Sequence, residues 1–165
     1  MDAKHLQHYA ILIICKVLSP IILYPSVIIS ISMLESIQLL SDTCEQLLEM
    51  DKSMRFASMA NNMGSLIATT YRQGLSPLMT RYETSKYATQ AVLRAAIRED
   101  FEIKLGKLRY SIGKYEKLIR ATVPIIHSSN KFYLLLTFDI ASDAKSIIEN
   151  KVMPCIESKK FAGPR

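Results

Sequence analysis

The sequence has no tryptophan, only five glycines and only three cysteines in 165 residues. Cys15, Cys44 and Cys155 lie far apart, none belongs to a Cys-x-x-Cys pair, and no histidine stands at ligand spacing from them. We therefore expect reduced thiols and neither a disulfide framework nor a zinc site. Arginines and aromatic residues do not alternate as a base-stacking surface for nucleic acid requires.

Motifs for nucleotide binding and catalysis are also missing. The scattered glycines form neither G-x-x-x-x-G-K-[ST] nor G-x-G-x-x-G, and neither H-E-x-x-H nor G-x-S-x-G occurs. His5, His8 and His127 are expected to be solvated, the last of them in a turn over residues 127–131. The sequence therefore predicts no catalytic, cofactor-binding or metal-ligating residue and a protein that is not an enzyme.

Residues 17–34 (VLSPIILYPSVIISISML) form an uncharged, strongly apolar run. As a helix they would span roughly 27 Å, close to the ~30 Å hydrocarbon core of a bilayer. This predicts that residues 1–34 are a separate segment with a single membrane anchor at 17–34. Three alternatives remain open: a secretory signal, an apolar helix buried against a partner, and translation from Met33, which would leave a cytoplasmic protein.

From residue 35 onward, the chain alternates between helical and strand patterns. Apolar residues at spacings of three and four predict a helix over 36–50. Strands are predicted over 54–60 and 65–72, joined by an Asn-Asn-Met-Gly turn at 61–64. Residues 73–77 form a loop.

The second half predicts one long helix, three strands and a last helix. The long helix spans 84–105, capped by Thr84 and stopped by Gly106. Strands follow over 108–112, 118–126 and 132–138, with Gly113 opening a turn and the third strand central, because it is apolar on both faces. The last helix begins at Ser142 and ends before Pro154.

These elements predict an α/β (α+β) fold with the order α-β-β-α-β-β-β-α. Hairpins joined by one crossing helix favour a five-stranded, mainly antiparallel sheet with helices on its faces. We assign this domain to residues 35–153 and a basic tail to residues 154–165.

The element order resembles the Roadblock/dynein-light-chain fold, a relative of the longin and profilin-like folds. Four pieces are also similar to a family of short archaeal proteins: MDKSMRFASM (50–59), NNMGSLIA (61–68), YRQGLSPLM (71–79) and LGKLRYSI (105–112). The resemblance implies a platform that forms homodimers, by extending the sheet or pairing the long helix. It also implies partners such as small GTPases, motor subunits or membrane scaffolds, and it implies no active-site residue.

Two surfaces are candidates for binding. The net charge is +6, and a basic patch is predicted on the late strands, where Arg109 and Arg120 would share the polar face of a hairpin together with Lys107 and Lys117. A second candidate is the loop with Arg72, Gly74 and Pro77, which tyrosines surround. The alternatives are an ordinary solvated sheet face and the rim of the core.

The leading functional prediction is a non-enzymatic, dimeric Roadblock-like module that regulates or scaffolds a small GTPase or a membrane complex. One alternative is a small-molecule sensor with a profilin-like pocket between the long helix and the sheet. The other is a binder of anionic lipid or nucleic acid through the basic sheet face, with nucleic acid the less favoured partner. No cofactor is expected.

Overall fold

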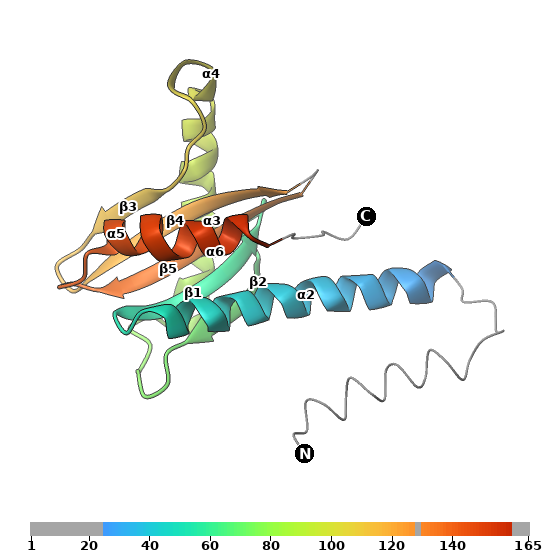
Figure 1. Ribbon diagram of the computed structural model, residues 1–165, viewed down its shortest axis with the longest axis horizontal. Helices are drawn as coiled ribbons and strands as arrows, with labels where there is room; N and C mark the ends of the chain where they lie inside the picture. The colour runs from blue at the N-terminus through green and yellow to red at the C-terminus, as the bar shows by residue number, and fades with distance from the viewer. Residues whose placement is uncertain (1–24, 128–129, 160–165) are drawn as a thin grey trace.

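The computed structural model describes residues 25–127 and 130–159, which fold around one antiparallel sheet. Five strands lie in the order β2-β1-β5-β4-β3 (Figure 1). Their bounds are Met54–Asn61 (β1), Leu66–Tyr71 (β2), Ser111–Lys114 (β3), Leu118–His127 (β4) and Asn130–Asp139 (β5). The predicted fold class, element order and central strand are confirmed, since β5 lies between β1 and β4.

Helices cover both faces of the sheet (Figure 1). One face carries α2 (Pro25–Met50) and a C-terminal helix made of α5 (Ala144–Ile147), the π-helical turn η1 (Ile148–Val152) and α6 (Met153–Glu157). The other face carries α3 (Arg81–Glu99), which is followed by the short helix α4 (Glu102–Leu105).

Each face of the sheet has its own apolar core, because successive strand residues point to opposite sides. In β5, Leu134 and Leu136 pack under α2 and the C-terminal helix, whereas Tyr133 and Leu135 pack under α3. Leucines of α2 fill the first core, and small residues of α3 (Ala88, Ala91, Val92 and Ala95) let that helix approach the sheet closely. Cys44 and Cys155 are free and buried in the first core, as predicted.

The prediction of an N-terminal membrane anchor is contradicted by the structure. Within the described ranges, no helix has both the length and the apolar character that crossing a membrane requires. The described part of the predicted anchor is continuous with α2, whose later turns carry Asp42, Glu45 and Glu49 on the exposed side and Leu40 and Leu47 against the sheet. Residues 17–24 of the predicted segment lie outside the described residues.

The turn between β1 and β2 has the predicted chemistry. The Asn61 side chain accepts hydrogen bonds from the backbone N–H groups of Met63 (3.0 Å) and Ser65 (2.9 Å). Gly64 has φ +82°, a conformation that costs a glycine little, and it packs directly against Thr89 of α3. The turn between β1 and β2 therefore packs against α3.

The long helix begins earlier and ends earlier than predicted. Thr80, rather than Thr84, is the N-cap, in a reciprocal capping box with Glu83. At the other end α3 stops at Glu99, because tertiary contacts hold this residue, and Gly106 then ends α4 at φ +82°.

The third strand is shifted three residues along the chain. It spans Ser111–Lys114, and Gly113, predicted to open a turn, pairs with Arg120 of β4. The segment before it is no strand, because Leu108 packs under α3 while Tyr110 packs in the core of the opposite face. His127, predicted in a turn, ends β4, and residues 128–129 lie outside the described residues.

The prediction that Pro154 ends the last helix is wrong. The Met153 N–H bonds to the Ile148 carbonyl five residues back, so the helix is widened in the turn that precedes the proline. A wider turn shifts the carbonyls with which a proline ring would collide. The helix continues to Glu157, with Cys155 and Ile156 buried.

The contact between Gly64 and α3 leads to a stability prediction. A Cβ at Gly64 would lie 2.5 Å from the Thr89 Cα, a backbone atom that cannot move without the helix. We expect Gly64→Ala to lower the free energy of unfolding by about 2–4 kcal/mol, through overpacking and backbone strain together. The matched control is Gly74→Ala at φ +77°, where a Cβ meets open space and only about 1 kcal/mol should be lost. Urea denaturation measures both, and equal losses would contradict the prediction.

Candidate functional site

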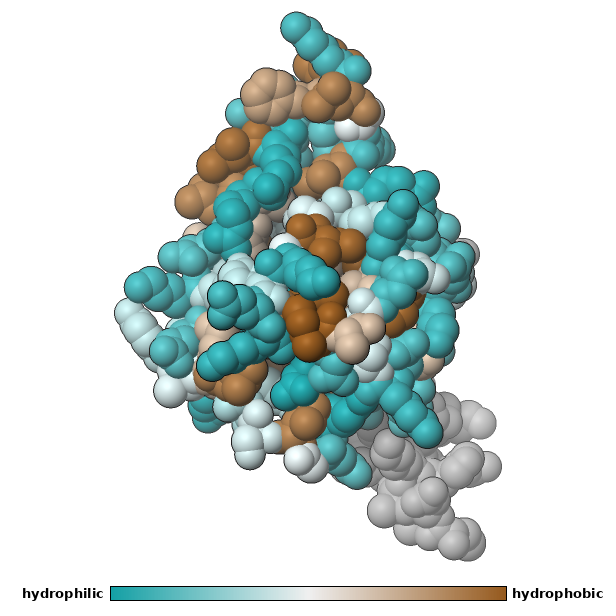
Figure 2. Space-filling view, turned by 90° about the vertical axis from the view of Figure 1, so that its left-hand side faces the viewer, coloured by the Kyte–Doolittle hydropathy of each residue, from teal (hydrophilic) through white to brown (hydrophobic). Residues whose placement is uncertain are grey.

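Among the residues whose side chains the structure describes, α3 and α4 carry several large exposed apolar side chains. The end of α3 and all of α4 project beyond the sheet (Figure 1). Large apolar side chains are exposed on the outer side of α3 and on α4, and we call them the apolar ridge: Leu93, Ile97, Phe101, Ile103 and Leu105. Figure 2 shows apolar side chains along this side of the molecule and around its upper end. A continuous apolar surface of this kind is typical of an interaction site.

The sheet edge next to the ridge is free in the described chain. Strand β3 pairs with β4 on one side only, and its Ile112, Gly113 and Lys114 are exposed. The pairing between β3 and β4 ends at Thr122, so Pro124, which has no N–H to donate, lies beyond it. The short strand β3 therefore forms the part of the sheet edge that lies beside the ridge.

A polar cluster fixes the direction of the ridge. Glu99, the last residue of α3, forms an ion pair with Lys131 of β5 and accepts a hydrogen bond from the Tyr133 hydroxyl (3.1 Å). Burial by itself would lower the pKa of Lys131. Its hydrogen bonds to Glu99 and Tyr133 outweigh this effect, so the pKa of Lys131 is raised. The end of α3 is therefore attached to the central strand, and α4 starts from a fixed point.

A hollow of about 450 Å³ lies between the start of α3 and the turn from β3 to β4. Its lining is mainly apolar and comes from two segments, with Leu78, Met79 and Tyr87 from the helix side and Tyr115, Glu116, Lys117, Leu118 and Arg120 from the sheet side. The Arg120 guanidinium stacks 3.6 Å from the Tyr87 ring centre, and Arg94 lies 5.4 Å from it. Burial raises the pKa of Tyr87, against the effect of Arg120, so this hydroxyl stays neutral.

The structure separates the four residues of the predicted basic patch. Arg109 pairs with Glu157 of α6 (3.1 Å), whereas Arg120 stacks on Tyr87 beneath α3. The prediction that these two arginines share one polar face is therefore wrong, because they lie on opposite sides of the sheet. Lys117 stands at the hollow and Lys107 is exposed ahead of β3. Binding of an anionic partner by these residues stays a prediction.

The predicted recognition loop is attached at both ends. Arg72 donates to the backbone carbonyl of Asp51 (2.6 Å), which holds the end of β2 against the end of α2. Gly74 is exposed at the loop tip, and Pro77 lines a small cavity of about 50 Å³ next to the hollow, with Phe56 and Tyr71. A recognition role for Arg72, Gly74 and Pro77 stays a prediction.

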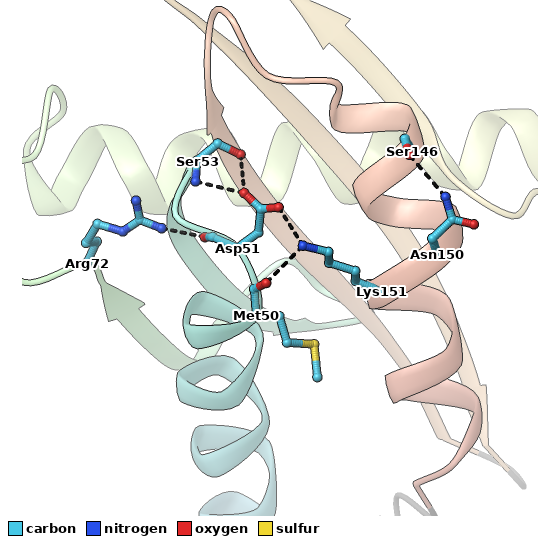
Figure 3. Close-up of polar contacts among 7 residues, drawn as sticks. All are labelled: Met50, Asp51, Ser53, Arg72, Ser146, Asn150 and Lys151. Carbon is cyan, nitrogen blue, oxygen red and sulfur yellow. Dashed lines mark hydrogen bonds and ion pairs between the residues drawn. The ribbon is translucent and has the colours of Figure 1, made fainter.

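Asp51 is the centre of a polar junction between the end of α2, strand β1 and the C-terminal helix (Figure 3). One carboxylate oxygen accepts from the Ser53 N–H (2.9 Å) and hydroxyl (2.7 Å), and the other pairs with Lys151 (2.9 Å). Lys151 also donates to the Met50 carbonyl at the end of α2 (3.1 Å). Burial disfavours the carboxylate, but these hydrogen bonds lower the pKa of Asp51 to about 2. We assign the junction a structural role, because every polar group in it is directed at another part of the chain.

The described residues contain no group of three or more His, Cys, Asp or Glu side chains placed to hold a metal ion. Dimerisation through the sheet edge or the long helix, and a pocket between the long helix and the sheet, were named as possibilities in the sequence analysis, but the residues of the ridge were not. The spacing of four among Leu93, Ile97 and Phe101 was the available signal.

An antiparallel sheet between two helical layers defines the class of the fold, and comparison with solved structures places it more closely. MglB with tetrameric arrangement is similar, with 15% identity, a TM-score of 0.59 and coverage of 74% of this chain and 86% of that one. A Roadblock/LC7 domain from Streptomyces avermitilis has 15% identity, a TM-score of 0.54 and coverage of 72% and 92%. The gliding protein MglB from Thermus thermophilus has 14% identity, a TM-score of 0.55 and coverage of 75% and 93%.

These similarities show that the chain has a Roadblock-like fold, so the predicted resemblance is confirmed for the fold. No protein-family model matches the sequence, and no curated protein is similar to it. The resemblance to a family of short archaeal proteins has no support in these comparisons.

The Asp51 junction makes the stability of the domain dependent on pH. A carboxyl group whose pKa is lowered by folding, here from 3.8 to about 2, stabilises the fold above its unfolded pKa and ceases to do so as the pH falls through its folded value. We expect Asp51→Asn to cost on the order of 1–2 kcal/mol at pH 7, and we expect this cost to shrink as the pH falls towards 2. The control is Asp42→Asn, an exposed carboxylate of α2 that accepts from Gln38. Chemical denaturation between pH 2 and 7 measures both variants, and a loss at pH 7 that persists at pH 2 would contradict the assignment.

Proposed function

We propose that this protein is a non-enzymatic interaction module that works as a homodimer and regulates or scaffolds a small GTPase. The observation that carries the proposal is the apolar ridge beside the free edge of β3. A ridge of this size is costly to leave in water, and an edge strand leaves backbone groups unpaired. A second copy of the chain satisfies both requirements with one contact.

The dimer forms around a two-fold axis through the β3 edge. Two β3 strands pair antiparallel, so the sheet continues from one copy into the other, and the projecting ends of the two α3 helices come together above the joined edge. The tetrameric arrangement of the similar MglB structure supports self-association as a property of the fold.

The partner class rests on the Roadblock-like fold, whose members the resemblance links to small GTPases. In the described residues, the exposed features are suited to binding rather than to chemistry: an apolar ridge, a strand edge and a hollow. Each of them is a surface for a macromolecule, and together they favour a platform.

The dimer is tested by placing a charge on the ridge. We expect multi-angle light scattering to show twice the chain mass for the wild type at micromolar concentration. Ile97→Asp should weaken dimerisation at least tenfold, because burial of an isoleucine contributes about 1.5–3 kcal/mol and a buried carboxylate costs more. The control Ser85→Asp makes the same charge change at an exposed position near the start of α3. A wild type that stays monomeric up to high concentration would refute the homodimer.

Small-GTPase binding is tested with purified proteins. Titration calorimetry of the dimer against small GTPases of the same organism, loaded with GDP or with a non-hydrolysable GTP analogue, should show binding that differs between the two nucleotide states. The Ser85→Asp dimer serves as a second binding-competent sample. Absence of binding in both states for every GTPase tested would remove this part of the proposal.

A further inference from the structure

The second edge of the sheet is strand β2, which pairs with β1 and has no neighbour on its other side within the described residues. Its six residues carry no charge and include no proline or glycine. Edge strands are commonly protected from further pairing by charges, prolines or bulges. The register shift of this hairpin lies near its turn, between Met59 and Ala60, so the edge from Ala68 to Tyr71 is regular and unprotected.

The hydrogen bonds of β2 show which of its backbone groups are directed away from the sheet. The Arg72 N–H donates to a backbone carbonyl of β1 (3.0 Å). The Ala68 carbonyl accepts from the Ser58 hydroxyl of β1 (2.6 Å). In an antiparallel pair, successive residues direct their backbone groups alternately towards the partner strand and away from it. The backbone groups of Thr69 and Tyr71 are therefore directed outward.

A groove of about 510 Å³ lies between the end of this edge and α2. Glu45, Leu48 and Glu49 line it from the helix, and residues 70–73 line it from the strand side. Glu45 and Glu49 are exposed and belong to none of the ion pairs within the described residues. The lining also contains Arg72, whose guanidinium is turned to a backbone carbonyl just after α2 (Figure 3). The groove thus has two carboxylates against one cation.

The charge of α2 continues this negative surface along the helix. α2 carries four carboxylates and no lysine or arginine, although the net charge of the chain is +6. The carboxylates are exposed and follow one another at spacings of seven, three and four residues, which places them on one side of the helix: Glu35, Asp42, Glu45 and Glu49. A stripe of negative charge beside an unpaired strand is complementary to an extended chain with positive side chains.

We propose that β2 binds an extended segment of a partner protein as an additional strand, and that this segment carries lysine or arginine at alternate positions. Its backbone pairs with the outward groups of Thr69 and Tyr71. Strand addition of this kind draws affinity from the backbone and specificity from the alternating side chains.

The two faces of β2 assign a chemistry to each set of side chains in the bound segment. Ala68 packs in the core under α2, and Tyr71 packs against the core under α3. Every second side chain of the added strand therefore lies on the face of α2, where a cation meets Glu45 and Glu49. The intervening side chains lie on the other face beside Tyr71, where uncharged residues fit.

The site goes beyond the proposed homodimer and does not depend on it. Because β2 and β3 are the two ends of the sheet, pairing of two β3 strands leaves both β2 edges free. A monomer therefore has one such site and a dimer has two.

The chemistry of the partner is tested by peptide selection on the full chain. A phage library of random short peptides is selected on the immobilised wild type, with counter-selection on the variant Glu45→Gln/Glu49→Gln. We expect enrichment of sequences with lysine or arginine at every second position. No enrichment, or enrichment of sequences without this alternation, overturns the proposal.

The role of the groove is tested with the most enriched peptide, which is synthesised and titrated by fluorescence anisotropy. Glu45→Gln combined with Glu49→Gln should weaken binding roughly fivefold, because two charge pairs are lost. The matched control removes two exposed carboxylates outside the groove, Asp100→Asn with Glu116→Gln, and should bind like the wild type. Equal losses in the two double variants would indicate attraction by net charge alone and would overturn the site.

The backbone contact is tested by amide hydrogen exchange and by a proline. The peptide should slow exchange at Thr69 and Tyr71, whereas Ala68 and Thr70 face β1 and should be protected without it. Thr69→Pro removes an outward N–H and should weaken binding at least tenfold, whereas Thr69→Ser keeps it and should bind normally. Circular dichroism establishes that Thr69→Pro is folded, and exchange in the wild type decides if it is not. Unchanged exchange at both outward amides overturns the strand addition.

Light scattering separates this inference from the proposed function. Failure of the peptide tests with a wild type of twice the chain mass overturns strand addition and leaves the homodimer intact. A monomeric wild type that binds the peptide as described refutes the homodimer and supports the β2 site.

Discussion

Strand β5 is buried on both faces, and its alternating side chains give the domain two cores in place of one. Leu134, Leu136 and Phe138 require a cover on one side, and Tyr133 and Leu135 require one on the other. The neighbours β1 and β4 pair with it along most of its length, so both helical layers are positioned relative to this strand. The end of α3 is also attached to β5, because Glu99 contacts Lys131 and Tyr133.

The two helical layers are attached to the rest of the domain by different kinds of contact. The layer of α2 and the C-terminal helix is attached by leucines, by the Asp51–Lys151 pair and by the Arg72 contact with the Asp51 carbonyl. The α3 layer is held by small residues and by Thr89 against Gly64, and its outer side remains apolar and exposed. The exposed apolar surface therefore lies on the side of the domain that α3 covers.

The exposed surfaces form a consistent set. A short edge strand, a helix end that projects past it and an apolar hollow after it all lie around β3. The proposed homodimer rests on these surfaces around β3.

The sequence by itself determined the local elements whose signals are local. The Asn61–Gly64 turn and the apolar pattern of β5 each depend on residues close together in the chain, and both were predicted. Thr80 and Glu83 have the spacing of a capping box in the sequence, but the N-cap was predicted at Thr84. Only tertiary structure decided where α3 ends, because Glu99 is held by residues of β5. It also decided that Arg109 and Arg120 lie on opposite faces, because the chain enters β3 three residues later than its alternation indicates. Periodicity shows that a residue has an apolar side but not which distant segment covers it, so the hollow and the exposed ridge became visible only after the strands had paired.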